Sequence, residues 1–547
     1  MSIHAYLFEA KSIQTYILES GRMRDLIGAS EMVDALTSDL LPDALHTLGF
    51  QDDGPVRFSR RAGGALYAFA NDIEPLERFA TLWSLLVQQF SPGLSFDAAR
   101  GTGSDEAAAF EAARAALLAD ASRFRPVLPI TAPITQRSSR TGQPGVEIDA
   151  SDQGVIDLPT KRKKSRFSNP ARIGLFTRFS PPKTDLRWRD WPRDLTPGVD
   201  GGFPFRGDDH TVALIHADGN GLGELLRKAK ERASKDPTQY VHLFRELSLA
   251  IAQTTERAAQ RATQAVLLPE REQRIKDNGG MQDQPLAARP IVLGGDDLTL
   301  LVRGDLAIRY LQEFLGAFEE ESRRRLPELQ IGTDGLTAGA GVVFMRASQP
   351  FYLATALAED LARLAKRQAK AIDTVAPPSA VAFHRVTNSM VERYEEIVLR
   401  EKTYVHHDTR FVDTLGAYAL HQGQGLPALS DLLELQELLA GPLMSRGPTR
   451  QLHSLIGLDL TQARSRYRRW QMLMRENQNP TLESFKATLE RLGQAQSPRV
   501  FGAYTEHPDL PYFTRQDGYV SPLADALTLT SVGSAMPEST ATEKEPS

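Results

Sequence analysis

The sequence predicts an α+β fold with two β-α-β-β-α-β units and a mainly helical C-terminal region. The main observation is that short apolar runs and longer helical stretches follow each other in the same order twice along the chain. The second observation is that glycines interrupt the sequence where short turns are required. Split units of this kind form an antiparallel sheet backed by helices, which is the ferredoxin-like or palm arrangement.

The first unit begins at the N-terminus. Apolar periodicity predicts its elements in order: a strand at 3–8, helical sequence at 12–47, two short strands within 58–70, a helix at 73–90 and a strand at 94–98. An Ala-rich stretch at 107–121 adds a helix, because alanine has the highest helix propensity.

The second unit has an extra helix and an extra strand. Its predicted elements are a strand at 211–217, helices from 222 and at 243–267, a hairpin around 294–297, a helix at 306–325, a strand at 336–345, a helix at 351–372 and a strand at 380–384. Two copies of one topology with little identity indicate an ancient duplication.

Composition narrows the class of protein. The chain has 547 residues, 41% apolar and 24% charged, which is typical of a globular protein with three or four domains. There is no cysteine, so disulfides, thiolate zinc sites and cysteine nucleophiles are excluded. The N-terminus does not resemble a signal peptide, and no apolar stretch is long enough to span a bilayer. We therefore expect a cytoplasmic protein without membrane contact.

The tetrapeptide Gly294-Gly295-Asp296-Asp297 lies between two apolar runs of strand length. The glycines let the backbone bend and let an anionic ligand approach. Two adjacent carboxylates repel each other, and a divalent cation offsets that cost. A solvated turn is the alternative interpretation, since Gly and Asp are ordinary turn residues.

A second motif, Asp218-Gly219-Asn220-Gly221-Leu222-Gly223, joins the strand 211–217 to a helix. A carboxylate here can hold a cation while the N–H groups and dipole of the helix face phosphates. By itself the motif is equally an ordinary helix cap with turn glycines.

The two motifs together predict one site. In a β-α-β-β-α-β sheet the first strand lies beside the central hairpin, so Asp218 can meet Asp296 and Asp297. Three carboxylates there could hold two divalent ions, Mg²⁺ or Mn²⁺, around a triphosphate. Lys366, late in the helix 351–372, could contact the phosphates. A solvated helix-face lysine is its alternative, and Lys370 competes for the same role.

These motifs resemble the second palm of the CRISPR polymerase family. That family is the large subunit of type III CRISPR effector complexes and is related to diguanylate and adenylate cyclases. Besides the two acidic motifs, the resemblance rests on Thr337-Ala338-Gly339-Ala340-Gly341, Pro350 and Ala365-Lys366. The stretches 10–17 and 22–30 look like the opening of the first palm in the same family. In all, the resemblance covers roughly residues 1–100 and 206–390.

The resemblance implies a nucleotidyltransferase, an oligoadenylate synthase or nucleotide cyclase that makes cyclic or linear oligonucleotide messengers from ATP or another NTP in antiviral defence. It implies that Asp218, Asp296 and Asp297 are catalytic and bind the metal. The implied nucleotide-binding residues are Gly219, Asn220, Gly221, Gly223, Gly294, Gly295 and Lys366. RNA or subunits of a defence complex are implied partners, and a palm–palm dimer is an arrangement left open.

Three departures from the family qualify this picture. Ala62-Gly63-Gly64-Ala65-Leu66 stands where an acidic motif would be, so we expect a degenerate, catalytically silent first palm. The chain starts directly at the palm, and His407-Asp408 lacks further ligands, so we expect no metal-dependent DNase. No zinc is expected, and residues 135–145 are interpreted as a metal-free remnant of the family's zinc site.

We predict five segments: a degenerate first palm at 1–124, an irregular connector at 125–205, the second palm with the Gly-Gly-Asp-Asp motif at 206–390, a helical C-terminal domain at 391–525 and a disordered tail at 526–547. In the connector, the basic run at 161–166 could contact a nucleic-acid backbone or be a solvated loop.

Two other functions stay open. The chain could be a catalytically silent nucleic-acid-binding scaffold of a defence complex, or a nucleotide sensor that binds without reacting. The mutual repulsion of the three carboxylates favours catalysis over both, since a scaffold does not need it.

Overall fold

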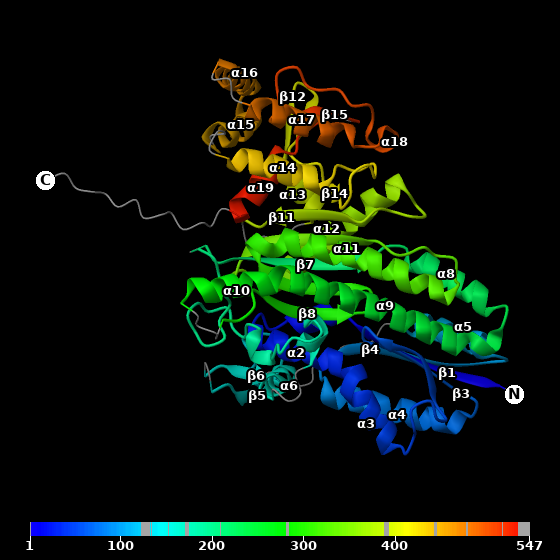
Figure 1. The fold of residues 1–547 in the computed structure, drawn as a ribbon. Helices are drawn as coiled ribbons and strands as arrows, with labels where there is room; N and C mark the ends of the chain where they lie inside the picture. The colour runs from blue at the N-terminus through cyan, green and yellow to red at the C-terminus, as the bar shows by residue number, and fades with distance from the viewer. Residues whose placement is uncertain are drawn as a thin grey trace.

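The computed structural model describes all residues except 1, 122–131, 133, 151–152, 170–173, 208, 280–283, 388–392, 442–445, 477–479, 517 and 534–547. The first palm lies at one end of the molecule, the second palm in the middle and the C-terminal region at the other end (Figure 1). In the described part of the chain, no helix is long and apolar enough to cross a membrane.

The first palm contains a four-stranded antiparallel sheet in the order β2-β3-β1-β4. Its strands are β1 (Ile3–Lys11), β2 (Arg57–Ala62), β3 (Ala65–Ala70) and β4 (Ser95–Gly103). Its helices are α1 (Ile13–Leu18), α2 (Met23–Ala35), α3 (Leu41–Thr47), α4 (Ile73–Phe90) and α5 (Glu106–Ala121). This is the predicted β-α-β-β-α-β order, with the helical sequence at 12–47 divided into separate helices.

The second palm repeats this topology and extends it. Its six-stranded sheet has the order β14-β11-β10-β7-β9-β8. The strands are β7 (Thr211–Gly219), β8 (Ala288–Gly294), β9 (Asp297–Arg303), β10 (Ala338–Arg346), β11 (Ala380–Arg385) and β14 (Ala417–Ala419). The main helices are α8 (Leu222–Ala233), α9 (Tyr240–Ala262), α10 (Leu268–Asp277), α11 (Ala307–Arg325) and α12 (Phe351–Ile372). The predicted α+β fold class is confirmed.

Strand β7 shows how the two palms are joined. Its side chains alternate between two cores: Ala213 and Ile215 face the core that includes α9 and α11, whereas Val212 and Leu214 face a core shared with α12 and the first palm. Both faces of β7 are therefore covered, which explains the apolar run from Val212 to Ile215. The palms pack as one body around this shared core.

The connector is more regular than the sequence predicted. It contains a hairpin of β5 (Gly145–Ile148) and β6 (Val155–Asp157), helix α6 (Leu158–Phe167) and the short helix α7 (Leu175–Phe179). Hydrogen bonds to the Asp157 carboxylate stabilise this hairpin: the Thr141 hydroxyl donates at 2.5 Å and the Thr160 amide at 2.8 Å.

The basic run of the connector lies in α6, and four of its cations, Lys161, Lys163, Lys164 and Arg166, are paired within the protein. Lys163 is wholly buried and donates a 2.6 Å hydrogen bond to the Tyr16 carbonyl of α1. Arg166 pairs with Asp39 at 2.9 Å, and Lys161 and Lys164 pair with connector carboxylates. The run attaches the connector to the first palm and is a helix rather than a solvated loop. Contact of its exposed cations, Lys161 and Arg162, with a nucleic-acid backbone stays a prediction.

The C-terminal region is mainly helical, as predicted, but it also contains a small sheet in the order β12-β13-β16-β15. The strands are β12 (Thr403–His406), β13 (Thr409–Val412), β15 (Phe513–Arg515) and β16 (Gly518–Val520). The helices are α13 (Tyr394–Glu401), α14 (Leu429–Ala440), α15 (Arg446–Leu458), α16 (Leu460–Glu476), α17 (Thr481–Gln494), α18 (Pro498–Phe501) and α19 (Leu523–Gly533).

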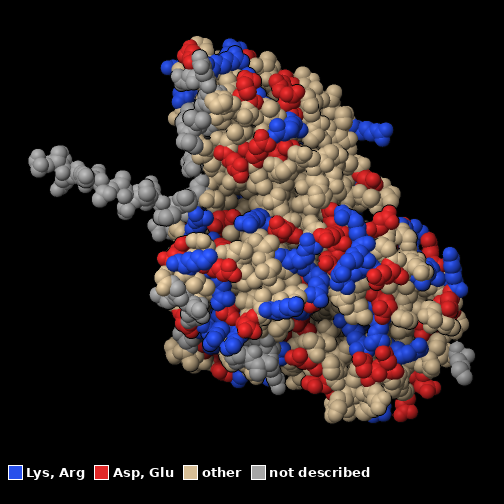
Figure 2. Space-filling model, viewed as in Figure 1, with Lys and Arg blue, Asp and Glu red and all other residues tan. Residues whose placement is uncertain are grey.

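The disordered tail predicted from residue 526 starts too early. Helix α19 continues to Gly533 because Ala526, Leu529 and Val532 are buried against the C-terminal core. The rest of the predicted tail lies outside the described residues. On the face shown in Figure 2, basic and acidic side chains are intermingled over the palms, in keeping with the small net charge of −5.

Gly28 of α2 allows α6 to pack against the first palm, and this can be tested. A Cβ atom at Gly28 would lie 1.9 Å from the Lys163 carbonyl oxygen, whereas a Cβ at Gly316 of α11 meets no atom within 4 Å. Alanine favours both helices by about 0.5–1 kcal/mol. We expect Gly316→Ala to be neutral or stabilising and Gly28→Ala to lower the free energy of unfolding by about 1–3 kcal/mol through overpacking. Urea unfolding measures both, and equal stabilisation would contradict the close packing.

Candidate active site

The sheet of the second palm brings three carboxylates together. Asp218 lies near the end of β7, Asp297 begins β9, and Asp296 occupies the turn between β8 and β9. Because Ala217 of β7 pairs with Leu298 of β9, the next residues of the two strands are neighbours. One carboxylate oxygen from each aspartate lies within 4.8 Å of the other two, a grouping that could hold a metal ion. The structure thus places the three predicted ligands at one end of the sheet.

Glycine is required on both strands of this site. A Cβ atom at Gly219 would lie 2.8 Å from the Asp296 carboxylate, so a larger residue would push Asp296 away from Asp218. Gly295 has φ 62°, a conformation that side chains disfavour. A Cβ at Gly294 would lie 3.1 Å from Gly63 Cα, because the β2–β3 turn of the first palm lies against this hairpin. The two palms are therefore paired within one chain at the tips of equivalent hairpins.

The clustered charges alter how the aspartates titrate. Burial, followed by the nearby Asp218 carboxylate, raises the pKa of Asp296 to about 6. Burial also raises the pKa of Asp297 well above its usual value, and the carboxylates of Asp296 and Asp218 add to this rise. The site therefore holds protons more tightly than isolated carboxylates do, and a divalent cation would compensate the same charge.

Lys366 lies at this cluster, as the sequence predicted. Its ammonium group forms an ion pair with Asp218 and donates a 2.8 Å hydrogen bond to the Gly219 carbonyl. The side chain crosses Gly339 of β10, where an added Cβ would lie 2.4 Å from Lys366 Cγ. Gly339 pairs with Asp218 in the sheet, so it provides the space through which the lysine reaches the carboxylate. The sequence contained this glycine in a motif but gave no reason for it.

Asn220 is buried, and its side chain braces the site. Its amide nitrogen donates to the Thr337 hydroxyl at 3.0 Å and to the Pro378 carbonyl at 3.4 Å. Gly221 precedes α8 with φ 77°. These contacts hold the loop after β7 in place, and a direct nucleotide contact by Asn220 stays a prediction.

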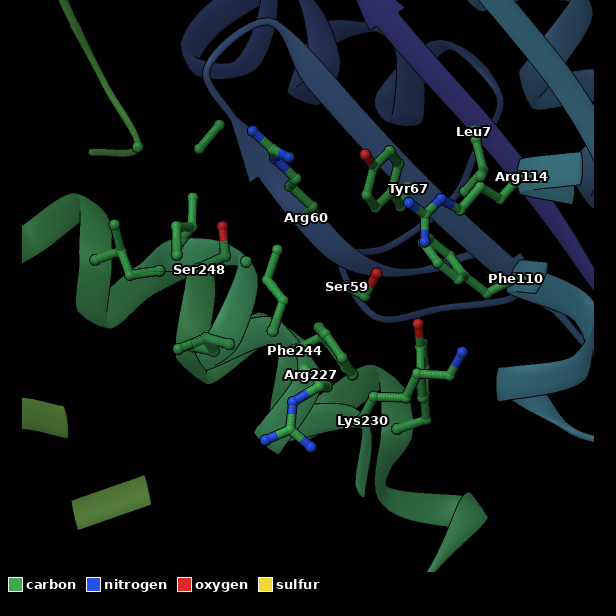
Figure 3. Close-up of a pocket in the computed structure, with 18 of the residues that line it drawn as sticks. Leu7, Ser59, Arg60, Tyr67, Phe110, Arg114, Arg227, Lys230, Phe244 and Ser248 are labelled. Atoms are coloured by element: carbon green, nitrogen blue, oxygen red, sulfur yellow. The ribbon is translucent and has the colours of Figure 1, made fainter. Parts of the chain in front are cut away.

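A cavity of about 480 Å³ opens on one side of the acidic hairpin, between the two palms (Figure 3). Gly223, Gly295 and Asp296 line it. The first palm contributes Leu7, Arg60, Tyr67, Phe110 and Arg114, and helices α8 and α9 contribute Arg227, Lys230, Phe244 and Ser248. Its walls thus combine aromatic rings, which suit a base, with cations, which suit phosphates. Glu9 and Glu111 also line it, and Lys230 pairs with Glu111 at 2.8 Å.

A second cavity of about 620 Å³ lies on the other side of the hairpin. Gly294 and Asp297 line it, together with Ser12, Gln14 and Thr15 from the start of α1 and Arg178 from α7. One carboxylate of the adjacent pair therefore faces each cavity. The other predicted site residues lie outside the walls of both cavities: Asp218, Gly219, Asn220, Gly221 and Lys366.

Fold and site define a palm domain with a three-carboxylate cluster at the end of its central strands. Residues 211–375 match the family model described as Cas10/Cmr2, second palm domain. The second palm of this chain therefore matches that family's model, and the resemblance to the large subunit of type III CRISPR complexes is confirmed. A comparison with curated proteins gives no significant match.

Several solved structures are similar to the chain at low identity. The apo Csm1–Csm4 cassette is 12% identical over 97% of this chain and 70% of that one, with a TM-score of 0.41. Csm1 from T. onnurineus is 13% identical over 90% and 69%, with a TM-score of 0.40. The Csm1–Csm4 cassette in complex with cA4 is 14% identical over 80% and 62%, with a TM-score of 0.37. The chain thus spans about three fifths of the Csm1 chain in that last structure.

The raised pKa values predict a pH-dependent metal effect. Since the folded-state pKa of Asp296 is raised, the stability linked to its proton is complete below pH 4 and is lost as pH rises through about 6. The raised pKa of Asp297 acts in the same direction. Without divalent cations, Asp296→Asn with Asp297→Asn should therefore melt several degrees higher than the unchanged protein at about pH 7.5. The difference should shrink towards pH 5.

Adding Mg²⁺ or Mn²⁺ at the higher pH should raise the melting temperature of the unchanged protein and leave that of the double variant unaltered. Calorimetry across the pH range measures both effects. A double variant that melts lower at every pH would contradict the repulsion.

Lys366 and a metal ion compete for Asp218, so removal of the lysine charge should strengthen metal binding. Lys366→Met should raise the Mn²⁺ affinity of the nucleotide-free protein by a factor on the order of 10, since one competing cation is removed. Lys370→Met, on the exposed side of the same helix, is the matched control and should leave Mn²⁺ binding unchanged. Electron paramagnetic resonance titration of free Mn²⁺ measures both, and weaker binding by Lys366→Met would refute the competition.

Proposed function

We propose that the second palm is a nucleotidyltransferase that joins ATP into cyclic or linear oligonucleotides. The observation that carries this proposal is the position of the three carboxylates between two cavities, with Asp296 lining one and Asp297 lining the other. Joining nucleotides requires two of them, and both cavities lie within the range of about 300–1,000 Å³ that is typical of small-molecule sites.

The residues fit a pair of divalent cations. Asp218, Asp296 and Asp297 present hard oxygen ligands and no sulfur or imidazole, which is the set that Mg²⁺ or Mn²⁺ prefers. Ions bound there would neutralise the clustered charge and supply Lewis acidity at the reacting phosphate.

The chain's own groups would orient the reactants. A ribose hydroxyl of one nucleotide attacks the α-phosphorus of the other; the new P–O bond replaces the bond to pyrophosphate, and the hydroxyl proton is released to solvent. Lys366 supplies positive charge next to Asp218, where the triphosphate would lie. The aromatic and basic walls of the 480 Å³ cavity would bind one nucleotide, and its first-palm residues make that binding depend on both palms.

The family of the second palm supports a role in a type III CRISPR-like defence system, with RNA or other complex subunits as partners. In this proposal the first palm has no metal chemistry, because its hairpin carries Gly63 and Gly64 without aspartates. Under this proposal, the two palms that line the 480 Å³ cavity belong to one chain.

The activity is tested with purified protein, ATP and Mn²⁺ or Mg²⁺, alone and with RNA. We expect pyrophosphate release and an oligonucleotide product, identified by mass spectrometry. Asp296→Ala with Asp297→Ala should lower turnover by about 10² or more, since the metal ligands are removed. Asp52→Ala with Asp53→Ala, an adjacent pair on an exposed turn, is the matched control.

Two results would replace the proposal. Tight ATP binding without product under every condition would identify a nucleotide sensor. Salt-sensitive RNA binding with neither ATP binding nor turnover would identify a scaffold. Turnover that persists in the Asp296/Asp297 double variant would rule out this site.

A further inference from the structure

Strand β8, which leads into the acidic hairpin, is the edge of its sheet and is held from outside the second palm. Its inner edge pairs with β9. On the outer edge, two alternate carbonyls accept side-chain hydrogen bonds: Ile291 from Ser30 of α2, and Leu293 from Arg178 of α7 at 2.6 Å. Alternate carbonyls of a strand point to the same side, so both donors satisfy one exposed edge.

Arg178 connects three parts of the chain. Besides Leu293, its guanidinium donates to Asp34 of α2 at 2.8 Å and to Glu256 of α9 at 3.4 Å. The side chains of Arg178 and Asp34 are 25% and 17% exposed, so this contact is partly shielded from water. A planar guanidinium can reach three acceptors at once, which an ammonium group cannot do in the same geometry.

The helix that carries Arg178 is itself fixed to the first palm. The buried carboxylate of Glu31 in α2 accepts hydrogen bonds from the amides of Gly174 at 2.7 Å and Leu175 at 3.0 Å. Leu175 and Phe179 are buried in the core of the second palm. Ser30, Glu31 and Asp34 lie within about one turn of α2, so this single helix anchors both α7 and β8.

The acidic turn needs such support. Leu293 precedes Asp296 by three positions, and the two residues between them are the flexible glycines Gly294 and Gly295. On the inner side, Thr255 of α9 donates to the Gly295 carbonyl at 2.6 Å, next to the Glu256 that contacts Arg178. The turn is therefore held from two sides, by α9 and by Arg178.

We propose that Arg178 is a positioning residue that sets the place of the Asp296–Asp297 turn. Through it, the connector and the first palm control metal affinity and reactivity in the second palm. The part on reactivity rests on the proposed function, whereas the parts on the turn and on metal binding do not.

A competing role for Arg178 is direct contact with a nucleotide, because it also lines the 620 Å³ cavity. The two roles differ in their response to substitution. Lysine keeps the positive charge of the cavity but loses the fork of donors, so Arg178→Lys should rescue a nucleotide contact and should not rescue positioning. Positioning acts on kcat and metal affinity, whereas nucleotide contact acts on KM.

The experiment compares Arg178→Gln and Arg178→Lys in the full chain with a matched control, Arg166→Gln. Arg166 also pairs the connector with the first palm, at 2.9 Å to Asp39, a residue outside both β8 and the acidic hairpin. Hydrogen–deuterium exchange of peptides covering 291–297 reports the turn directly. Mn²⁺ titration reports the carboxylate cluster, and kcat and KM for ATP report the reaction.

We expect both Arg178 variants to speed exchange in 291–297 by about tenfold or more, the effect of losing one charge-assisted hydrogen bond. Both should weaken Mn²⁺ binding severalfold and lower kcat with KM little changed, while Arg166→Gln alters none of these. Exchange in 291–297 that is unchanged, or that rises equally in Arg166→Gln, would overturn the proposal. A rise in KM alone that lysine rescues would assign Arg178 to nucleotide contact instead. If the unchanged protein shows no turnover, the proposed function fails, and the exchange data still decide the role of Arg178.

Discussion

The mutual repulsion of three carboxylates is the constraint on which the surrounding structure depends. Carboxylate oxygens of Asp218, Asp296 and Asp297 lie within 4.8 Å of one another. Burial and this proximity work against the ionisation of Asp296 and Asp297. Neighbouring groups keep them in place. The missing side chain of Gly219 leaves room for Asp296, and Lys366 provides a positive charge at Asp218. A bound divalent cation would offset the electrostatic repulsion that opposes the assembly of this cluster.

The first palm supports this site without contributing an acidic group to it. Its turn at Gly63 lies against Gly294, its strands and α5 form a wall of the 480 Å³ cavity, and its helices share a core with β7 and α12. A shared apolar core gives the two palms one relative position, because separating them would expose that core to water. The first palm can therefore shape the cavities even though its own hairpin lacks aspartates.

Much of the fold could be predicted from sequence because its signals are local. The helices 73–90 and 351–372 match α4 and α12, and the strand at 211–217 matches β7 apart from its last two residues. The acidic cluster could be predicted because topology alone brings the first strand beside the central hairpin. The structure of the connector could not be predicted, since it depends on contacts with the first palm that are distant in sequence. Lys163 and Arg166 read as solvated cations until their partners Tyr16 and Asp39 are in place.

The same distinction applies within the site. Aspartates and turn glycines can be recognised by residue type. Gly339, Arg178 and Thr255 act through contacts with Lys366, Leu293 and Gly295 that only the tertiary structure creates. Gly339 matters because Lys366 crosses it, and that depends on the register of β10 with β7 and on the position of α12. Ser248, Phe244 and Tyr67 meet around a cavity although they belong to different palms. Sequence reasoning therefore finds the residues whose type indicates a chemical role, and misses those whose role is to position other groups.

The two cavities beside the hairpin are chemically unequal, and this follows from having two different palms in one chain. If both palms carried acidic turns, each cavity would have an equivalent set of carboxylates, and a nucleotide in either could serve as donor. Here the cluster belongs to one palm. Asp296 faces the cavity with aromatic and basic residues in its walls, and Asp297 faces the cavity lined by Gln14 and Thr15. Under the proposed function, this inequality gives the transfer a fixed direction, with the triphosphate that reacts and the hydroxyl that attacks in different surroundings.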